Sequence, residues 1–118
     1  MLRTVLCALV IASAIPAAQA RSHHHRHGHG GTPWCGIYLS NYLGKHDGNL
    51  ALARNWAHEG SPASGPGVGV VAVWPHHVGI ITGRTSDGEW IVHSGNDGGA
   101  VRTRPRSLAG VIAFRYVS

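Results

Sequence analysis

The chain has 118 residues, of which 43% are hydrophobic and 13% charged, and its formal net charge is +5 at pH 7. This length allows one small domain with a modest core and excludes a multidomain protein. The positive charge favours anionic surfaces such as cell-wall polymers, but no nucleic-acid-binding motif accompanies it, so we expect no nucleic acid partner.

The first twenty residues have the pattern of a secretory signal. Arg3 supplies the charged start, residues 5–15 form an apolar run too short to cross a bilayer, and AQA at 18–20 is a small-x-small cleavage site. We therefore predict a signal peptide at 1–20 and an exported protein, periplasmic or secreted, with no transmembrane segment after cleavage.

A histidine-rich segment follows at residues 21–31 (RSHHHRHGHGG). It has no apolar side chain and nothing to bury, which predicts a disordered linker. Closely spaced imidazoles also suit a late divalent transition metal, so a solvated spacer and a metal-binding tail both remain open. The candidate metal ligands are His23, His24, His25, His27 and His29.

The folded domain is predicted to span residues 32–118 and to begin with a helix. Thr32 is a suitable N-cap and Pro33 a suitable first helical residue, which puts Cys35 in the first turn, and Gly44 is expected to end the helix. A second short helix is predicted from an N-cap at Asn49 to a stop at Gly60.

Beyond this point the pattern changes to short runs of β type. Residues 61–67 (SPASGPG) are predicted to form a loop, and Pro105 suits an edge strand. Helices first and strands afterwards predict an α+β domain, with the Cys35 helix packed on a small antiparallel sheet. The strands are expected at residues 68–74, 78–82, 89–93, 101–104 and 111–117.

Cys35 is the candidate nucleophile. Cys7 leaves with the signal, so Cys35 remains as an odd cysteine in an oxidising compartment, where it is inert and buried, paired between chains, or reactive. A helix start and a nearby imidazole both favour a thiolate. His77, at the start of a strand, is the candidate general base, and its neighbour His76 is expected to face the other side of the sheet.

A third residue would orient the base, and the segment WIVHSGND offers His93 and Asn96. A two-residue turn on Asp87-Gly88 puts Asn96 on the face of His77. A loop with an odd number of residues, or a bulge, puts His93 there instead. The sequence leaves both possibilities open.

Four segments in order, PWCGIYLSNYL, VGVVAVW, HVGIITGR and WIVHSGN, resemble the CHAP and NlpC-type cysteine peptidases, which are bacterial cell-wall hydrolases. The resemblance covers residues 33–117. It implies a minimal papain-like fold, Cys35 as nucleophile, His77 as base, and no cofactor. Its third residue is His93 by the NlpC-type pattern and Asn96 by the CHAP pattern.

The resemblance implies an amidase or endopeptidase that cleaves peptidoglycan peptides. Two other hypotheses stay open: an inactive wall-binding or structural domain of the same fold, and an exported metal-binding protein that uses the histidine-rich segment. Trp34, beside the cysteine, is a candidate for lining the substrate cleft. Alternating arginines at 102, 104 and 106 are expected to share one face, either solvated or in contact with an anionic polymer.

Overall fold

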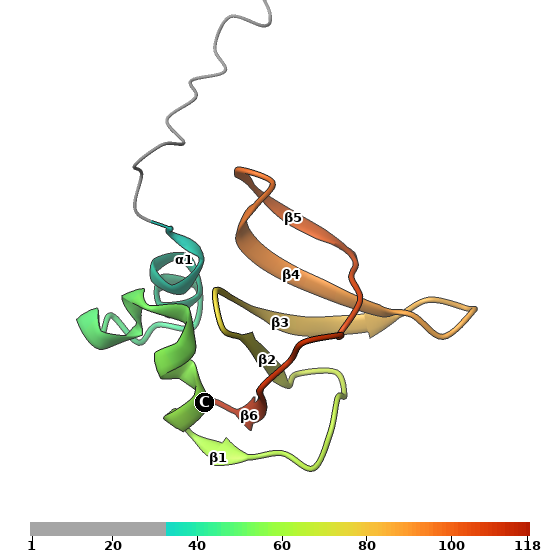
Figure 1. Cartoon of the computed structure of the whole chain (residues 1–118), viewed down its shortest axis with the longest axis horizontal. Helices are drawn as coiled ribbons and strands as arrows, with labels where there is room; N and C mark the ends of the chain where they lie inside the picture. The colour runs from blue at the N-terminus through green and yellow to red at the C-terminus, as the bar shows by residue number, and fades with distance from the viewer. Residues whose placement is uncertain (1–32) are drawn as a thin grey trace, which may run out of the picture. The chain divides into compact units, whose positions relative to one another are not determined.

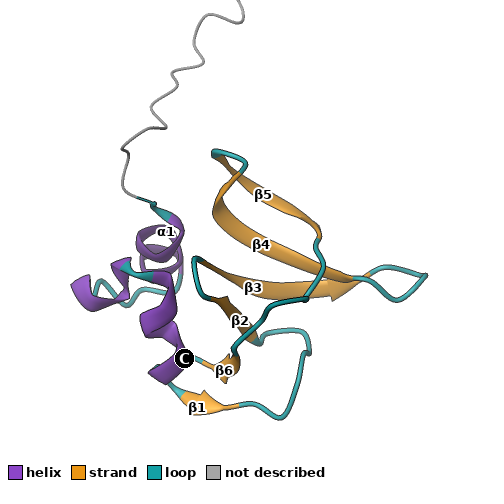
Figure 2. Cartoon of the chain, in the orientation of Figure 1, coloured by secondary structure: helices purple, strands orange, loops and turns teal. Residues whose placement is uncertain are grey.

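The structure is a computed structural model that describes residues 33–118, so the predicted signal peptide and the histidine-rich segment, with all five candidate metal ligands, lie outside the described residues. Helices precede strands, as predicted, and the class is α+β (Figure 2). The elements are α1 (Cys35–Tyr42), the 3-10 helices η2 (Gly48–Ala51) and η3 (Ala53–His58), and strands β1 (Ser61–Pro62), β2 (Val71–Trp74), β3 (His77–Arg84), β4 (Trp90–Asp97), β5 (Ala100–Pro105) and β6 (Ala113–Tyr116).

The strands form one antiparallel sheet of six strands in the order β1-β6-β2-β3-β4-β5. β5 lies at an edge and ends at Pro105, which confirms the edge position expected for this proline. β1 was not predicted, because its two residues lie in a stretch with loop composition; their pairing with β6 forms it. α1 lies at the end of the sheet where β3 begins (Figure 1).

The first helix begins later than its sequence signals predict. Trp34 is the N-cap residue, with φ −117° and no capping hydrogen bond from its side chain, and Cys35 is therefore the first helical residue. The N–H groups of the first helical turn have no hydrogen-bond partner within the helix. Cys35 therefore lies next to N–H donors that the helix itself does not use. The predicted end is confirmed, since α1 stops at Tyr42 and Gly44 follows with φ +72°.

The second helix is divided, contrary to the prediction. Leu52 is extended, with φ −90° and ψ 123°, and separates η2 from η3. The N-cap of η2 is Asp47, whose side chain accepts from the N–H of Asn49, so the cap lies two residues before the predicted one. Gly60 follows η3 with φ +65° and turns the chain toward β1, as expected of a stop residue.

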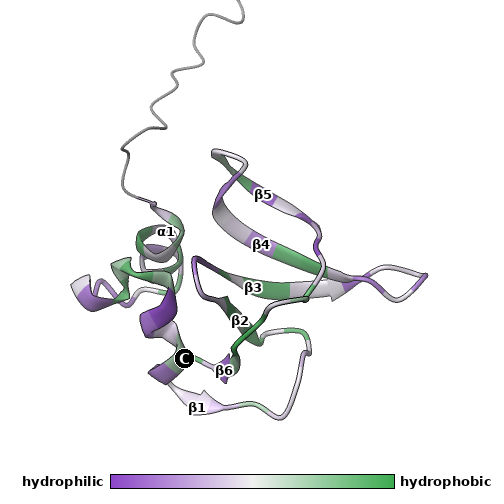
Figure 3. Ribbon diagram, in the orientation of Figure 1, coloured by the Kyte–Doolittle hydropathy of each residue, from purple (hydrophilic) through white to green (hydrophobic). Residues whose placement is uncertain are grey.

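Apolar side chains cover both faces of the sheet. The core on the α1 side contains Cys35, Leu39, Trp56, Val73 and Val78 among its buried residues. The core on the opposite face is built from Val70, Ala72, Trp74, Ile81 and Val92. β2 supplies alternate residues to the two cores, which explains why its whole length is hydrophobic (Figure 3).

Gly36 allows α1 to approach η2 closely. A Cβ at this position would overlap the carbonyl oxygen of Leu50 and lie 2.7 Å from that of Ala51, and both are backbone atoms that cannot rotate away. Gly36→Ala is therefore expected to lower the free energy of unfolding by about 1–3 kcal/mol. Urea unfolding measures this, with Gly48→Ala as the control, because no atom lies within 4 Å of a Cβ there. Equal losses in the two variants would contradict the packing argument.

Candidate functional site

The Cys35 thiol is buried against the start of β3. Its side chain is 1% exposed, and its Sγ donates to the carbonyl oxygen of His76 at 4.0 Å. The backbone N–H groups of Val78, Gly36 and Cys35 itself face the sulfur and stabilise its anion, but burial outweighs them and raises the pKa of the Cys35 thiol. The resting group is therefore a neutral thiol, surrounded by N–H donors.

A tight hairpin brings the chain to this sulfur. Trp74 pairs with His77, so Pro75 and His76 form the turn between β2 and β3. Since the sulfur contacts the backbone of His76 and of Val78, it lies beside the residue between them, His77. The sulfur thus lies beside the backbone of His77, while the His77 imidazole belongs to the opposite face of the sheet. None of the hydrogen bonds within residues 33–118 joins the thiol to an imidazole.

His77 is buried on the face of the sheet opposite the α1 core. Its Nε2 lies 2.9 Å from the Oγ of Ser94, and its ring centroid lies 5.7 Å from that of Trp74. Burial, assisted by the Arg106 cation and opposed by Asp97, lowers the pKa of His77 to about 4. The imidazole is therefore neutral at pH 7, as a general base must be.

The register of β3 and β4 decides which residues share a face with His77. The connection at 85–89 has an odd number of residues, and the register also shifts between Ile81 and Gly83. Either irregularity alone would reverse the side-chain parity, but the two together restore it. The even-numbered residues of β4 therefore face His77, and Ser94 is the one that bonds to it.

His93, one of the two candidate third residues, lies away from His77. It pairs with Ile80, which packs against the α1 core. Its Nε2 is 2.7 Å from the Tyr38 hydroxyl and its Nδ1 is 2.7 Å from the Thr103 hydroxyl, so both ring nitrogens have partners on α1 and β5. Its ring also lies 4.8 Å from that of Tyr42. This arrangement ties α1 to the sheet.

Asn96, the other candidate, lies where β4 departs from regular pairing with β5, between the Ser94–Arg102 and Asp97–Ala100 pairs. Its φ of 53° is left-handed, a conformation that asparagine tolerates better than most residues. Sequence reasoning weighed His93 and Asn96 but missed Ser94 between them. The signal that identifies Ser94 is strand parity combined with the two register changes.

Trp34 precedes Cys35 in the chain, and its side chain packs against Tyr38 and over Gly95. Its ring meets that of Tyr38 edge to face, with centroids 6.5 Å apart. Both side chains cover Gly95, where a Cβ would lie 2.6 Å from the Cβ of Tyr38 and 2.8 Å from the Trp34 ring. Gly95 thereby lets α1 approach the end of β4, near the site.

Asp97 forms a charged cluster on the His77 face. Its carboxylate is 2% exposed and accepts from the side chains of Arg104 and Arg106, while Arg102 donates to its main-chain oxygen. Hydrogen bonding from Arg104 holds the pKa of the Asp97 carboxyl below its usual range. Arg102 and Arg104 pair with Ser94 and Val92, which confirms that the arginines of β5 share one face.

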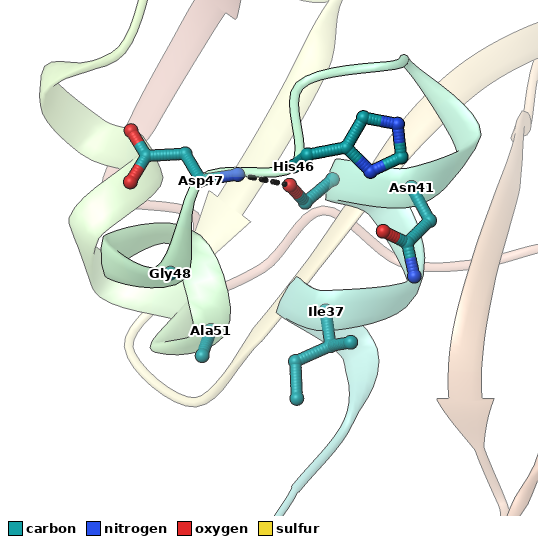
Figure 4. A pocket seen from close by; sticks show the side chains of 7 residues that line it. Ile37, Asn41, His46, Asp47, Gly48 and Ala51 are labelled. Carbon is teal, nitrogen blue, oxygen red and sulfur yellow. Dashed lines mark hydrogen bonds between the residues drawn. The ribbon is translucent and has the colours of Figure 1, made fainter.

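Two cavities lie near α1. One, of about 370 Å³, lies beside the turn between β2 and β3, and its lining does not include Cys35. The lining residues are Pro33, Ala51, Leu52, Ala53, Arg54, Pro75 and His76. His76 therefore lies on the turn and lines this cavity. The second cavity, of about 250 Å³, lies between α1 and η2 (Figure 4), where the Asp47 N–H donates to Ser40.

Within residues 33–118, no three histidine, cysteine or acidic side chains are grouped so that they could hold a metal ion. None of the helices in this part of the chain is long and apolar enough to cross a membrane. In comparisons with known proteins, no family model, no curated protein and no solved structure matches this chain.

Proposed function

We propose that this chain is an exported cysteine amidohydrolase or endopeptidase with a minimal papain-like fold, and that it cleaves amide bonds in peptidoglycan peptides. Cys35 is the nucleophile and His77 the general base. The observation that carries the proposal is the position of the Cys35 sulfur, which opens α1 and lies against the backbone on both sides of His77. Ser94 takes the role of the third residue, because it bonds to the imidazole.

The protonation states favour a mechanism in which proton transfer accompanies attack. Burial raises the pKa of the thiol and lowers that of His77, so the resting pair is uncharged. When the Nε2–H of His77 donates to Ser94, Nδ1 is the nitrogen left to accept a proton. Because the imidazole lies on the face of the sheet opposite α1, the proposed transfer requires it to turn about the start of β3 toward the sulfur. The sulfur then attacks the amide carbonyl carbon, and a free N–H of the first turn of α1 donates to the oxyanion.

The second half of the reaction returns the proton. His77 gives it to the leaving amine as the C–N bond breaks, which leaves a thioester on Cys35. Water, deprotonated by His77, hydrolyses the thioester to a carboxylic acid and restores the thiol. The 370 Å³ cavity beside the turn offers room for an apolar part of the substrate, since Pro33, Leu52 and Pro75 line it.

A non-catalytic wall-binding domain of the same fold is the second candidate. The observation in its favour is the burial of the thiol, which is 1% exposed and bonded to a carbonyl oxygen. This candidate predicts binding to peptidoglycan that Cys35→Ala leaves unchanged, with no release of fragments.

Digestion of purified peptidoglycan by the secreted chain tests the proposal, with newly exposed amino groups as the readout. Cys35→Ala and His77→Gln are each expected to lower the rate by about 10³-fold or more, because each removes a member of one catalytic unit. His58→Gln is the matched control, because His58 is exposed at the end of η3, and it is expected to change the rate by only a few fold. Wild-type protein that binds peptidoglycan without releasing amines would replace the proposal by the second candidate.

A further inference from the structure

One buried carboxylate organises three arginine side chains at the edge of the sheet. Arg104 donates to Asp97 through Nε, at 2.9 Å, and also through Nη2, while Arg106 Nη1 donates to Oδ1 at 3.1 Å. Arg102 Nε donates to the Asp97 main-chain oxygen at 2.7 Å. We call Asp97 and these three arginines the arginine cluster. Its guanidinium groups are fixed in place before any ligand arrives.

The cluster carries more positive charge than its carboxylate neutralises. Three guanidinium groups surround one ionised aspartate. Of the other acidic side chains, Asp47 caps η2 and Glu59 lies beside Lys45, so neither contacts these arginines. The side chains of Arg104 and Arg106 remain 51% and 29% exposed. Since a guanidinium has five N–H donors, donors remain for an oxyanion in solution.

The arginine cluster adjoins the residues of the proposed reaction. The Arg106 guanidinium carbon lies 5.1 Å from the centroid of the Trp74 ring, and that ring lies 5.7 Å from the His77 ring at an interplanar angle of 55°. The Arg106 cation adds to the effect of burial in lowering the pKa of His77, and at Cys35 it opposes the burial that raises the pKa of the thiol. An anion on Arg106 would therefore lie next to the site where the amide is cleaved.

We propose that the arginine cluster is an anion-binding site beside His77, and that it takes a carboxylate of the peptide substrate. The inference rests on the proposed function for the identity of the ligand. Arg104 and Arg106 both donate to Asp97, so their guanidinium groups are neighbours. The donors that remain on them suit the two oxygens of a carboxylate and select acidic peptides over neutral ones. The bound carboxylate also offsets the Arg106 charge at His77, which strengthens this base when substrate is present.

Turnover of two peptides that differ only in a carboxylate or a carboxamide beside the cleaved bond measures the selectivity. The wild type is expected to prefer the carboxylate peptide by about tenfold or more in kcat/KM, mainly through KM. Arg106→Gln is expected to abolish the preference and Arg106→Lys to retain part of it. Arg84→Gln, which removes a guanidinium from above Trp90 at the other end of β3, is the matched control and should keep the preference.

Binding to the inactive Cys35→Ala chain tests the site without turnover. Calorimetric titration is expected to show that glutarate binds and glutaramide does not. Arg106→Gln is expected to weaken glutarate binding about tenfold, and added salt is expected to weaken it further. Glutarate binding without any peptide cleavage would overturn the proposed function and leave the anion site standing. Cleavage with no carboxylate preference and no glutarate binding would overturn the anion site alone. Binding of inorganic phosphate but not of glutarate would overturn the assignment to a carboxylate.

Discussion

Acidification from pH 6.5 to pH 4 is expected to reduce the free energy of unfolding by up to about 3 kcal/mol through His77. Burial and the Arg106 cation lower the pKa of this histidine from 6.5 to about 4 in the folded protein. Between these values the unfolded chain binds a proton that the folded protein does not, so stability rises with pH across this window and is lost as pH falls through it.

Urea unfolding at several pH values between 4 and 7 measures this loss, and His77→Gln is the comparison. The variant lacks the titrating imidazole but keeps a side chain that can bond to Ser94, so its stability should depend less steeply on pH in this range. Asp97 does not interfere with this measurement. Its pKa is held below the ordinary value of 3.8, so its contribution to the free energy of unfolding is lost only at a pH below that of the His77 transition. Equal pH dependence in the two proteins would contradict the assigned pKa.

The same titration predicts the acid limb of the proposed activity. Because His77 must be neutral to accept the thiol proton, kcat/KM for an uncharged peptide is expected to stay high down to about pH 5 and to fall with a midpoint near the His77 pKa of about 4. A midpoint at the ordinary histidine pKa of 6.5 would show that another, more exposed histidine is the base.

Replacement of Trp56 by alanine is expected to cost about 3–5 kcal/mol of stability. Trp56 is fully buried in the core on the α1 side, and its indole N–H donates to the carbonyl oxygen of Leu50 at 2.9 Å. This hydrogen bond connects η3 to η2, and the Trp56 ring belongs to the same core as Cys35 and the β2 residue Val73. The total free energy of unfolding of a native domain is about 5–15 kcal/mol, so the variant should be close to unfolding at 37 °C.

Thermal and urea unfolding followed by circular dichroism check this value. Trp56→Phe keeps most of the buried area but leaves the Leu50 oxygen without its donor, so a smaller loss of about 1–3 kcal/mol is expected. Leu52→Ala is the control, since Leu52 is exposed between η2 and η3 and should change stability by no more than about 0.5 kcal/mol. A loss for Trp56→Ala that is no larger than that of Leu52→Ala would contradict the core assignment.

Local signals in the sequence predicted much of the fold. Gly44 and Gly60 end their helices with positive φ, and Pro105 lies on an edge strand, because these residues act through their own backbone dihedral angles and hydrogen-bonding capacity. The change from helical to alternating periodicity predicted the α+β class. The helix start was predicted too early, because Thr32 and Pro33 suit a helix start but do not force one.

The relation between the reactive residues was decided by the tertiary structure. The connection after β3 has an odd number of residues, and the register shifts between Ile81 and Gly83; each reverses the side-chain parity, so together they leave it unchanged. For this reason Ser94, and not His93, shares the face of His77. Side-chain parity depends on every irregularity in a strand pair, and these are set by packing on both faces of the sheet. Sequence alone therefore named the segment that holds the partner of His77 but not the partner.

By itself, the sequence determined the class of the domain, the position of Cys35 in the first turn of a helix and the alternation of the arginines along β5. The tertiary structure decided the burial of the thiol, the low pKa of His77 and the gathering of three arginines around Asp97. The physical reason is that backbone preferences act over a few neighbouring residues. Desolvation and charge pairing depend instead on groups that only the folded chain brings together.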